Sequence, residues 1–205
     1  MAVSWGTTRI WAIAILLVMA SAILFALRLR QTGLSTRTPP GPFEKLAATQ
    51  VRAWLVPAKA RTSLNPLVAN AETLTQGRNH WADHCATCHA NNGNGDTEMG
   101  RHFYPPAPDM RTAATQSLSD GELYYIIRNG VPLTGMPAWG DSSLGDSDSQ
   151  TWALVSFIRH LPLLTPDELA EMEKLNPKSA AEREEEQAEE DFLNGRSNTK
   201  NATQH

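Results

Sequence analysis

Apolar residues along the chain predict one long helix near the N-terminus and several shorter helices after it. Residues 10–27 form a run of eighteen residues without a charge, which approaches the thickness of the hydrocarbon core of a membrane, and Trp5 and Trp11 are placed for its interface. We therefore predict a retained membrane anchor. A cleaved signal peptide is the alternative, because residues 20–22 (Ala-Ser-Ala) resemble a cleavage site.

The central part of the chain begins with a predicted helix that runs from the cap candidate Asn70 towards Cys85. Gly77 and Trp81 lie four residues apart on one face of this helix. Because Gly77 has no side chain, a second helix can approach closely there, and Trp152 or Ser156 is the expected counterpart.

Two further helices are predicted in the same region. A middle helix over residues 123–128 follows a capping pattern that starts at Ser119 and is ended by Asn129 and Gly130. A closing helix over residues 150–161 stops at Pro162. No segment shows a convincing strand alternation, so we expect an all-α fold with long loops rich in proline and glycine.

Composition divides the chain into four predicted segments: 1–30, a membrane anchor or signal segment; 31–70, an extended linker arm; 71–163, the folded domain; and 164–205, an acidic helical or disordered tail. Prolines make the arm turn-rich near residue 40, yet Trp54 is costly to leave in water. We therefore expect the arm to lie extended across the domain, with a loose linker as the alternative.

The predicted tail opens with a strong helix start, in which Thr165 is the cap, Pro166 follows and Glu168 completes the capping pattern. That helix is expected over residues 167–175. The stretch after residue 178 favours helix but is polar on every side, so it is either a solvated helix or disordered. Its acidic strip either docks a basic redox partner or serves solubility.

Charge is distributed unevenly. Residues 1–70 carry eight Lys or Arg against one acid, residues 71–163 five against ten, and residues 164–205 five against eleven, for a net charge of −4. The basic residues are spread thinly over the anchor and arm and do not gather into an aromatic-laced patch. We therefore expect no nucleic-acid partner.

The motif that carries chemistry is Cys85-Ala-Thr-Cys88-His89, the attachment sequence of c-type haem. Cysteines three residues apart lie on one side of a helical turn, so both sulfurs can form thioethers with one porphyrin. His89 follows directly and is the expected proximal iron ligand. The chain has no other cysteine.

Other interpretations of this motif fit less well. A structural zinc site needs four ligands, and His84 as a fourth would place all of them within six residues. A thioredoxin-like centre needs an α/β pattern that is absent here. A plain disulfide with this spacing makes a strained loop.

The sixth iron ligand is expected to be Met136, 47 residues beyond His89, on a loop in which Gly135 and Pro137 shape the backbone. A thioether favours ferrous iron and raises the reduction potential. Core filling is the alternative role for this methionine. The rival ligands are Met99, Met110, His80, His84 and His102, of which His102 is the best nitrogen donor.

The segment around residues 104–110 contains three prolines, which lack amide donors and leave carbonyl groups free. We expect the carbonyl of Pro105 or Pro106 to accept the Nδ1–H of His89 and to fix its ring orientation. A rigid surface loop without a haem role is the alternative.

Together these features resemble class I monohaem cytochromes c, and most closely the cbb3-type cytochrome c domains. The residues that carry the resemblance, within about residues 71–163, are Gly77, Trp81, Cys85, Cys88, His89, Gly93, Gly95, Asn129, Gly130, Gly135, Met136, Pro137, Trp139 and Trp152. It implies three to five helices around one covalent haem c, His89/Met136 ligation and one-electron transfer. Such domains usually have a smaller residue at position 81, so a wider helix crossing is expected.

We expect an electron carrier rather than an enzyme, shuttling between membrane-associated redox proteins such as a quinol-oxidising complex, a terminal oxidase or a dehydrogenase. A fixed subunit of such a complex is the alternative, and a haem enzyme or gas sensor is a more distant one. Arginines after the apolar run favour a cytoplasmic domain. Haem attachment in similar bacterial proteins is completed outside the inner membrane, so we predict a single-pass inner-membrane protein with a periplasmic domain.

Overall fold

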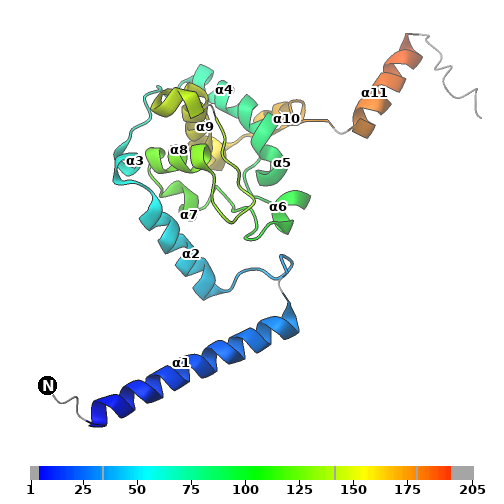
Figure 1. Cartoon of the computed structure of the whole chain (residues 1–205). Helices are drawn as coiled ribbons and strands as arrows, with labels where there is room; N and C mark the ends of the chain where they lie inside the picture. The colour runs from blue at the N-terminus through cyan, green and yellow to red at the C-terminus, as the bar shows by residue number, and fades with distance from the viewer. Residues whose placement is uncertain (1–4, 34, 141, 179, 195–205) are drawn as a thin grey trace, which may run out of the picture. The chain divides into compact units, whose positions relative to one another are not determined.

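The structure, a computed structural model, describes residues 5–33, 35–140, 142–178 and 180–194. The chain divides into two units, Met1–Thr38 and Pro39–His205. The described residues form helices and loops and contain no β-strand, which confirms the all-α prediction (Figure 1).

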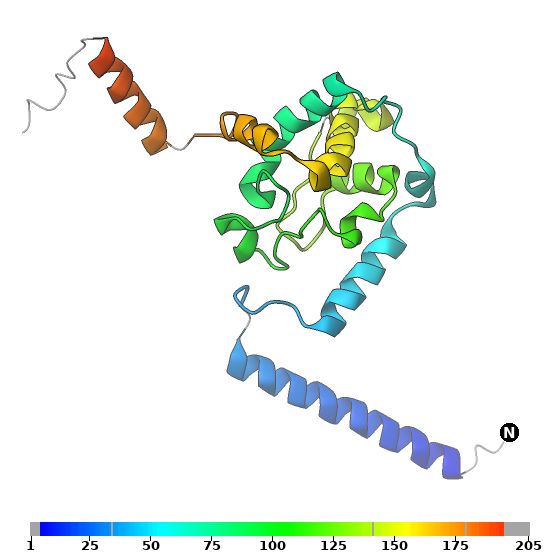
Figure 2. The same cartoon turned by 180° about the vertical axis from the view of Figure 1, so that it is seen from behind.

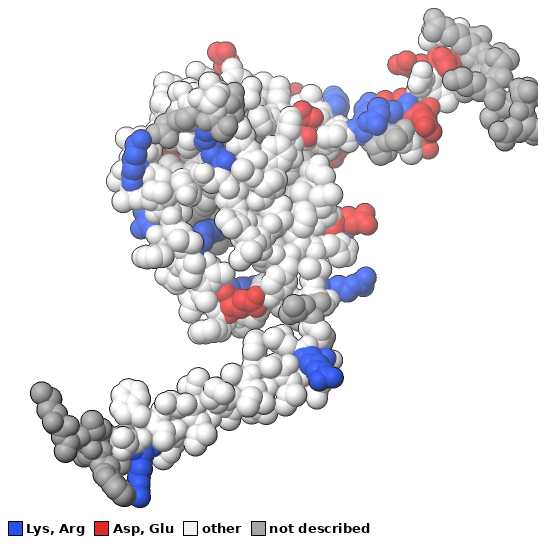
Figure 3. All heavy atoms as spheres, in the orientation of Figure 1, with Lys and Arg blue, Asp and Glu red and all other residues white. Residues whose placement is uncertain are grey.

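The first unit is built on one helix, α1 (Trp5–Thr32). Residues Thr8–Gln31 of this helix are long and apolar enough to cross a membrane, although a signal sequence has the same features. Figure 3 shows a surface free of charge along most of α1, with basic side chains near its two ends. An apolar N-terminal helix is therefore present, as predicted.

The second unit contains the remaining elements. In chain order they are α2 (Pro42–Leu55), α3 (Ala58–Thr62), α4 (Ala71–His80), a π-helical turn (Trp81–Cys85), α5 (Ala86–His89), α6 (Glu98–His102), α7 (Ala113–Gln116), α8 (Asp120–Asn129), a 3-10 turn (Ser142–Ser147), α9 (Ser149–His160), a 3-10 turn (Leu161–Leu163), α10 (Pro166–Glu173) and α11 (Ala180–Leu193).

Helices α4 and α9 cross at Gly77 and lie side by side in both views (Figures 1 and 2). A Cβ atom on Gly77 would lie 2.2 Å from the carbonyl oxygen of Ala153 and 2.8 Å from Cβ of Phe157. The close approach was predicted correctly, but its counterparts are Ala153 and Phe157 rather than Trp152 or Ser156. These two residues are four apart and share one face of α9.

Side-chain caps fix the starts of these helices, and those at Asn70 and Ser119 were predicted. The Asn70 side chain accepts from the Thr73 amide, and Asp148 accepts from the amides that open α9. The Ser119 and Glu122 capping box at the start of α8 is present as predicted. Helix α8 ends at Gly130, whose φ of 66° suits glycine.

The core lies between α4, α8 and α9. Trp81, Phe157 and Val155 are almost completely buried, and the ring of Tyr124 stacks on that of Trp152 at 4.0 Å. Met172 of α10 is also fully buried in this core. The first helix of the acidic segment, which opens with the predicted Thr165 and Glu168 capping box, therefore packs on the domain.

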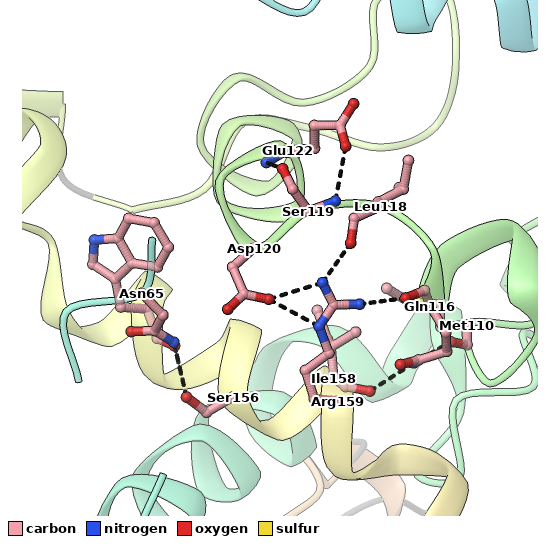
Figure 4. A network of polar contacts seen from close by, with 11 residues as sticks. Asn65, Met110, Gln116, Leu118, Ser119, Asp120, Glu122, Ser156, Ile158 and Arg159 are labelled. Carbon is pink, nitrogen blue, oxygen red and sulfur yellow. Dashed lines mark hydrogen bonds and ion pairs between the residues drawn. The ribbon is translucent and has the colours of Figure 1, made fainter. Parts of the chain in front are cut away.

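Arg159 connects α9 to the segment that leads into α8 (Figure 4). Its Nε donates to Asp120 Oδ1 at 2.9 Å, Nη1 donates to the Gln116 carbonyl at 2.8 Å, and Nη2 donates to the Leu118 carbonyl. The Gln116 amide returns a hydrogen bond of 2.9 Å to the Ile158 carbonyl. One guanidinium thus satisfies carbonyl groups where α7 ends and α8 begins.

The arm is helical where an extended spacer was expected, which corrects that prediction. Pro42 at the first position of α2 starts a helix because its ring fixes φ at a helical value. The end of the arm does cross the domain, since Asn65 Nδ2 donates to the Trp152 carbonyl at 3.0 Å and to Ser156 Oγ at 2.9 Å. Trp54, which we expected to be covered, is 80% exposed.

The segment after residue 179 forms the helix α11. Most of its described side chains are exposed, including Phe192 at 82% and Leu193 at 74%. Of the two predicted states of this segment, the structure has the solvated helix over Ala180–Leu193.

Candidate haem-attachment site

The attachment motif lies where α4 changes its winding. The π-helical turn Trp81–Cys85 follows α4, and α5 carries Cys88 and His89. The sequence predicted a continuous α-helix here, and a π-turn is a local widening that periodicity does not reveal. Cys85 and Cys88 are both free, so no disulfide occupies their sulfurs.

Trp81 fixes the end of the attachment helix. Its side chain is 1% exposed, and its indole N–H donates to the Ala90 carbonyl at 3.0 Å. The indole ring also lies 5.7 Å from the His89 ring and 5.8 Å from the Phe157 ring, measured between centroids. Ala90 itself has a φ of 61°, an uncommon value for a non-glycine residue. Trp81 therefore holds the chain in the turn that follows His89.

His89 presents a half-buried imidazole. Its Nδ1 atom is buried without a hydrogen-bond partner of good geometry. Burial lowers the pKa of His89, and the backbone carbonyl of Pro108 opposes this by raising it. The carbonyl that acts on the ring is thus that of Pro108 rather than the predicted Pro105 or Pro106. The net lowering favours the neutral imidazole, which is the form that ligates iron.

The loops beside His89 pack closely on one another. The Gly95 amide donates to the His89 carbonyl at 2.9 Å, and the Met110 amide donates to the Gly93 carbonyl at 2.8 Å. A Cβ atom on Gly95 would lie 2.4 Å from the Ala107 carbonyl oxygen. This approach, which only glycine permits, brings the proline-rich segment against the attachment helix and so explains how Pro108 reaches His89.

The two cysteines are protonated thiols in the polypeptide. Burial, with a smaller contribution from the neighbouring Cys88, raises the pKa of Cys85 to about 12. Burial also raises the pKa of Cys88. Cys88 Sγ lies 3.4 Å from the sulfur of Met99, which is 49% exposed. Neither thiol is therefore activated for redox exchange, which argues against a thioredoxin-like centre.

The Met136 loop is held by its own hydrogen bonds. The Val131 amide donates to the Met136 carbonyl at 3.1 Å, and the Met136 amide donates to Thr134 Oγ1 at 3.1 Å. A Cβ atom on Gly135 would lie 2.5 Å from the ring of Phe103. Met136 is half-buried, and its backbone is fixed by this turn.

A depression of about 520 Å³ adjoins the attachment helix, and Thr87, Glu98, Met99, His102 and Phe103 line it. The ring of Phe103 joins this depression to the Met136 loop through its contact with Gly135. Sequence reasoning did not single out Phe103 or Thr87, and their chemistry gave no signal that separates them from ordinary surface residues.

The rival ligands have other contacts. His102 Nδ1 lies 2.6 Å from the Glu98 carbonyl within α6, and His84 Nδ1 lies 3.1 Å from Asp83 Oδ2. Met110 packs against the hydrophobic core. Within the described parts of the chain, no group of three or more His, Cys, Asp or Glu is placed to hold a metal ion.

The residues present fit a c-type haem. Two free sulfurs lie three positions apart, the next side chain is a half-buried imidazole whose buried Nδ1 is not satisfied, and Thr87 between the two cysteines lines a depression. This donor set matches thioether attachment and axial ligation of one porphyrin iron.

A comparison with protein families matches residues 72–158 to the family described as cytochrome C oxidase, cbb3-type, subunit III. A search of curated proteins finds no match. The match begins in α4 and ends in α9, so it contains the helix crossing, the attachment motif and the Met136 loop. Residues 72–158 therefore belong to the cbb3-type cytochrome c domains, a family that implies a haem c cofactor and haem-based electron transfer.

Proposed function

We propose that the chain is an electron carrier with one covalent haem c, attached through Cys85 and Cys88 and ligated by His89 and Met136. The observation that carries this proposal is the pair of free cysteines directly before His89, whose imidazole Nδ1 is buried. The cytochrome family of residues 72–158 supports it.

The polypeptide attaches the haem, ligates its iron and shields it from solvent. Cys85 and Cys88 supply the thioether sulfurs, and the burial that keeps His89 neutral also keeps its Nε2 lone pair available for iron. Trp81 restrains the histidine from the core side. A haem held in this way supplies a one-electron couple.

Ligation by both His89 and Met136 leaves no axial position for a substrate, so we propose a carrier and not an enzyme. The thioether of Met136 favours the ferrous state and raises the reduction potential. The hydrogen-bonded turn around Met136 and the contact of Gly135 with Phe103 support a side chain held in one place. This pre-organisation limits the structural change that accompanies electron transfer.

The site of action that we propose is a bacterial inner membrane, with α1 as a retained single-pass anchor and the haem domain in the periplasm. The length and apolar composition of Thr8–Gln31 support an anchor. The partners are then membrane-associated redox proteins, such as a quinol-oxidising complex, a terminal oxidase or a dehydrogenase.

A fixed subunit of an oxidase or dehydrogenase complex is the second candidate, because the matched family is described as a subunit of an oxidase. Purification from membranes in mild detergent separates the two. A carrier elutes alone, whereas a fixed subunit co-elutes with the other chains of its complex.

Haem binding is tested on the full chain made with a cytochrome c maturation system. We expect its intact mass to exceed that of the polypeptide by one haem, a weak red absorption band from iron–sulfur ligation in the ferric form, and no carbon monoxide binding in the ferrous form. A bare polypeptide mass would overturn the attachment. Ready binding of carbon monoxide would overturn the carrier and favour a haem enzyme or gas sensor.

A further inference from the structure

Helix α2 has an apolar face that is open to solvent. No described side chain of α2 is buried. The exposed apolar residues, with their exposed fractions, are Phe43 (84%), Trp54 (80%), Leu55 (60%), Leu46 (58%) and Val51 (54%). Positions 43, 47, 51 and 54 recur at intervals of three and four, so they line one side of the helix. Contiguous exposed apolar surface of this kind marks a binding surface.

The contacts of α2 with the rest of its unit use other atoms. The carboxylate of Glu44 accepts a hydrogen bond from the Tyr104 hydroxyl, and the Ala53 carbonyl accepts one from Arg61. The first contact ties α2 to the cytochrome domain and the second ties it to α3, and Phe43 and Trp54 stay uncovered.

The position of α2 in the chain indicates what covers this face. Helix α1 ends at Thr32 and α2 begins at Pro42, so nine residues join them. Nine extended residues span at most roughly 30 Å. In an anchored chain, α2 therefore stays within reach of the membrane surface.

The charges of α2 also suit a membrane surface. Lys45 and Arg52 lie on the side of the helix away from Phe43 and Trp54, and Glu44 is its single acid. A helix with aromatic residues on one face and basic residues on the other is typical of segments that lie in the plane of a membrane interface. Anionic headgroups attract the basic side chains.

We propose that α2 lies in the membrane interface, with its apolar face in a bilayer that contains anionic phospholipid. This inference rests on the anchored form of the proposed function. Through the hydrogen bond between Glu44 and Tyr104, α2 then holds the segment that carries Pro108, the backbone contact of His89, at a fixed orientation to the membrane. A second attachment of this kind restricts which side of the domain faces a partner in the same membrane.

The test is photolabelling of the haem-loaded full chain in nanodiscs of phosphatidylethanolamine and phosphatidylglycerol. A small fraction of the lipid carries a diazirine on its acyl chain, and labelled peptides are mapped by mass spectrometry. We expect label in residues 43–55 as well as in α1. In the triple variant Phe43→Ser, Val51→Ser and Trp54→Ser, the amount of label in residues 43–55 is expected to fall at least about five-fold, because the variant removes apolar surface that enters the bilayer. The amount of label in α1 is expected to stay the same.

The control is the double variant Leu64→Ser and Val68→Ser, which removes apolar side chains that are 84% and 75% exposed but lie outside α2. Its labelling pattern should match that of the parent. Label in α1 alone overturns the placement of α2 and leaves the anchored carrier intact. If α2 is unlabelled and the parent forms a dimer that the triple variant does not, the face is instead an interface between copies. Label in neither helix overturns the anchor as well, while haem absorbance reports separately on the cytochrome.

Discussion

The missing side chain of Gly77 lets α4 approach α9 until the position of its Cβ lies 2.2 Å from the carbonyl oxygen of Ala153. The neighbouring residues Trp81 and Phe157 are almost completely buried and in contact, with ring centroids 5.8 Å apart. The helices thus cross closely although position 81 carries a bulky tryptophan, and the wider crossing that we expected is not found. The indole is accommodated because it points past the close-approach point, towards Ala90 and His89.

Replacing Gly77 with alanine is expected to destabilise the domain by about 1–3 kcal/mol, the usual cost of overpacking. The contact is with backbone, so the helices have to move apart. Chemical denaturation of the haem-loaded chain measures the effect. Gly41→Ala is the control, because a Cβ atom there has no neighbour within 4 Å. Equal stability of the two variants would contradict a tight crossing.

Arg159→Lys is expected to lower the free energy of unfolding by about 1–3 kcal/mol. A lysine cannot reproduce the fork that bonds Asp120 and the carbonyls of Gln116 and Leu118, so carbonyl groups are left without a donor. The matched control is Arg111→Lys, since Arg111 pairs with Asp109 two residues away on the exposed surface. A loss no greater than in this control would show that water replaces the network without cost.

The pH dependence of α10 should follow Glu168. Burial raises the pKa of Glu168, but hydrogen bonds from the Thr165 backbone and from the His160 and Thr165 side chains lower it by more, so the net change is a decrease. A carboxyl group with a lowered pKa stabilises the folded state above its ordinary pKa, and this contribution is lost as the pH falls through the folded-state value. Amide exchange in α10 should therefore become faster as the pH falls below about 4.5, relative to the intrinsic rate.

Glu168→Gln should remove most of this pH dependence while keeping the capping box, because glutamine also serves at that position. Asp109→Asn is the control. The pKa of Asp109 is also lowered, chiefly by its hydrogen bond with Arg111, but its carboxylate bonds to that residue and not to α10. An unchanged acid response of α10 in Glu168→Gln would show that another group governs its docking.

Local signals predicted local structure well. The capping boxes at Ser119 and Thr165 and the stop at Gly130 depend on neighbours within a few residues, so the sequence contains all that determines them. The arm was misassigned because prolines near residue 40 were interpreted as a continuing spacer, whereas Pro42 begins a helix. Composition describes a segment on average and does not locate such a boundary.

Tertiary details of the site were less accessible. Gly77 identified a close approach, but the residues that face it depend on how α9 is rotated about its axis. An error of one residue in the position of α9 brings different side chains to that face. The choice of Pro108 over Pro105 depends on how the loop at Gly95 packs, and single-residue chemistry does not encode that path. The attachment motif itself is contiguous, so it was visible at once. The ligand role of Met136 stays a prediction.

Met136→Ala is expected to leave the haem attached and to change the iron. Loss of the thioether should remove the weak red band of the ferric form, convert the iron to high spin and let the ferrous form bind carbon monoxide. The reduction potential should fall by a measurable fraction of the roughly 0.8 V range that axial ligation spans. Absorption spectroscopy and redox titration of the purified variant measure these changes, and an intact mass that still includes one haem shows that Cys85 and Cys88 hold it.

The controls are Met99→Ala, which removes the sulfur beside Cys88, and Met110→Ala, which removes a side chain that packs on the core. Both should keep the parent spectrum, since neither residue lies on the hydrogen-bonded Gly135 and Met136 turn. If Met136→Ala keeps the parent spectrum and Met99→Ala shows these changes instead, the sixth ligand is Met99 of α6 and not Met136.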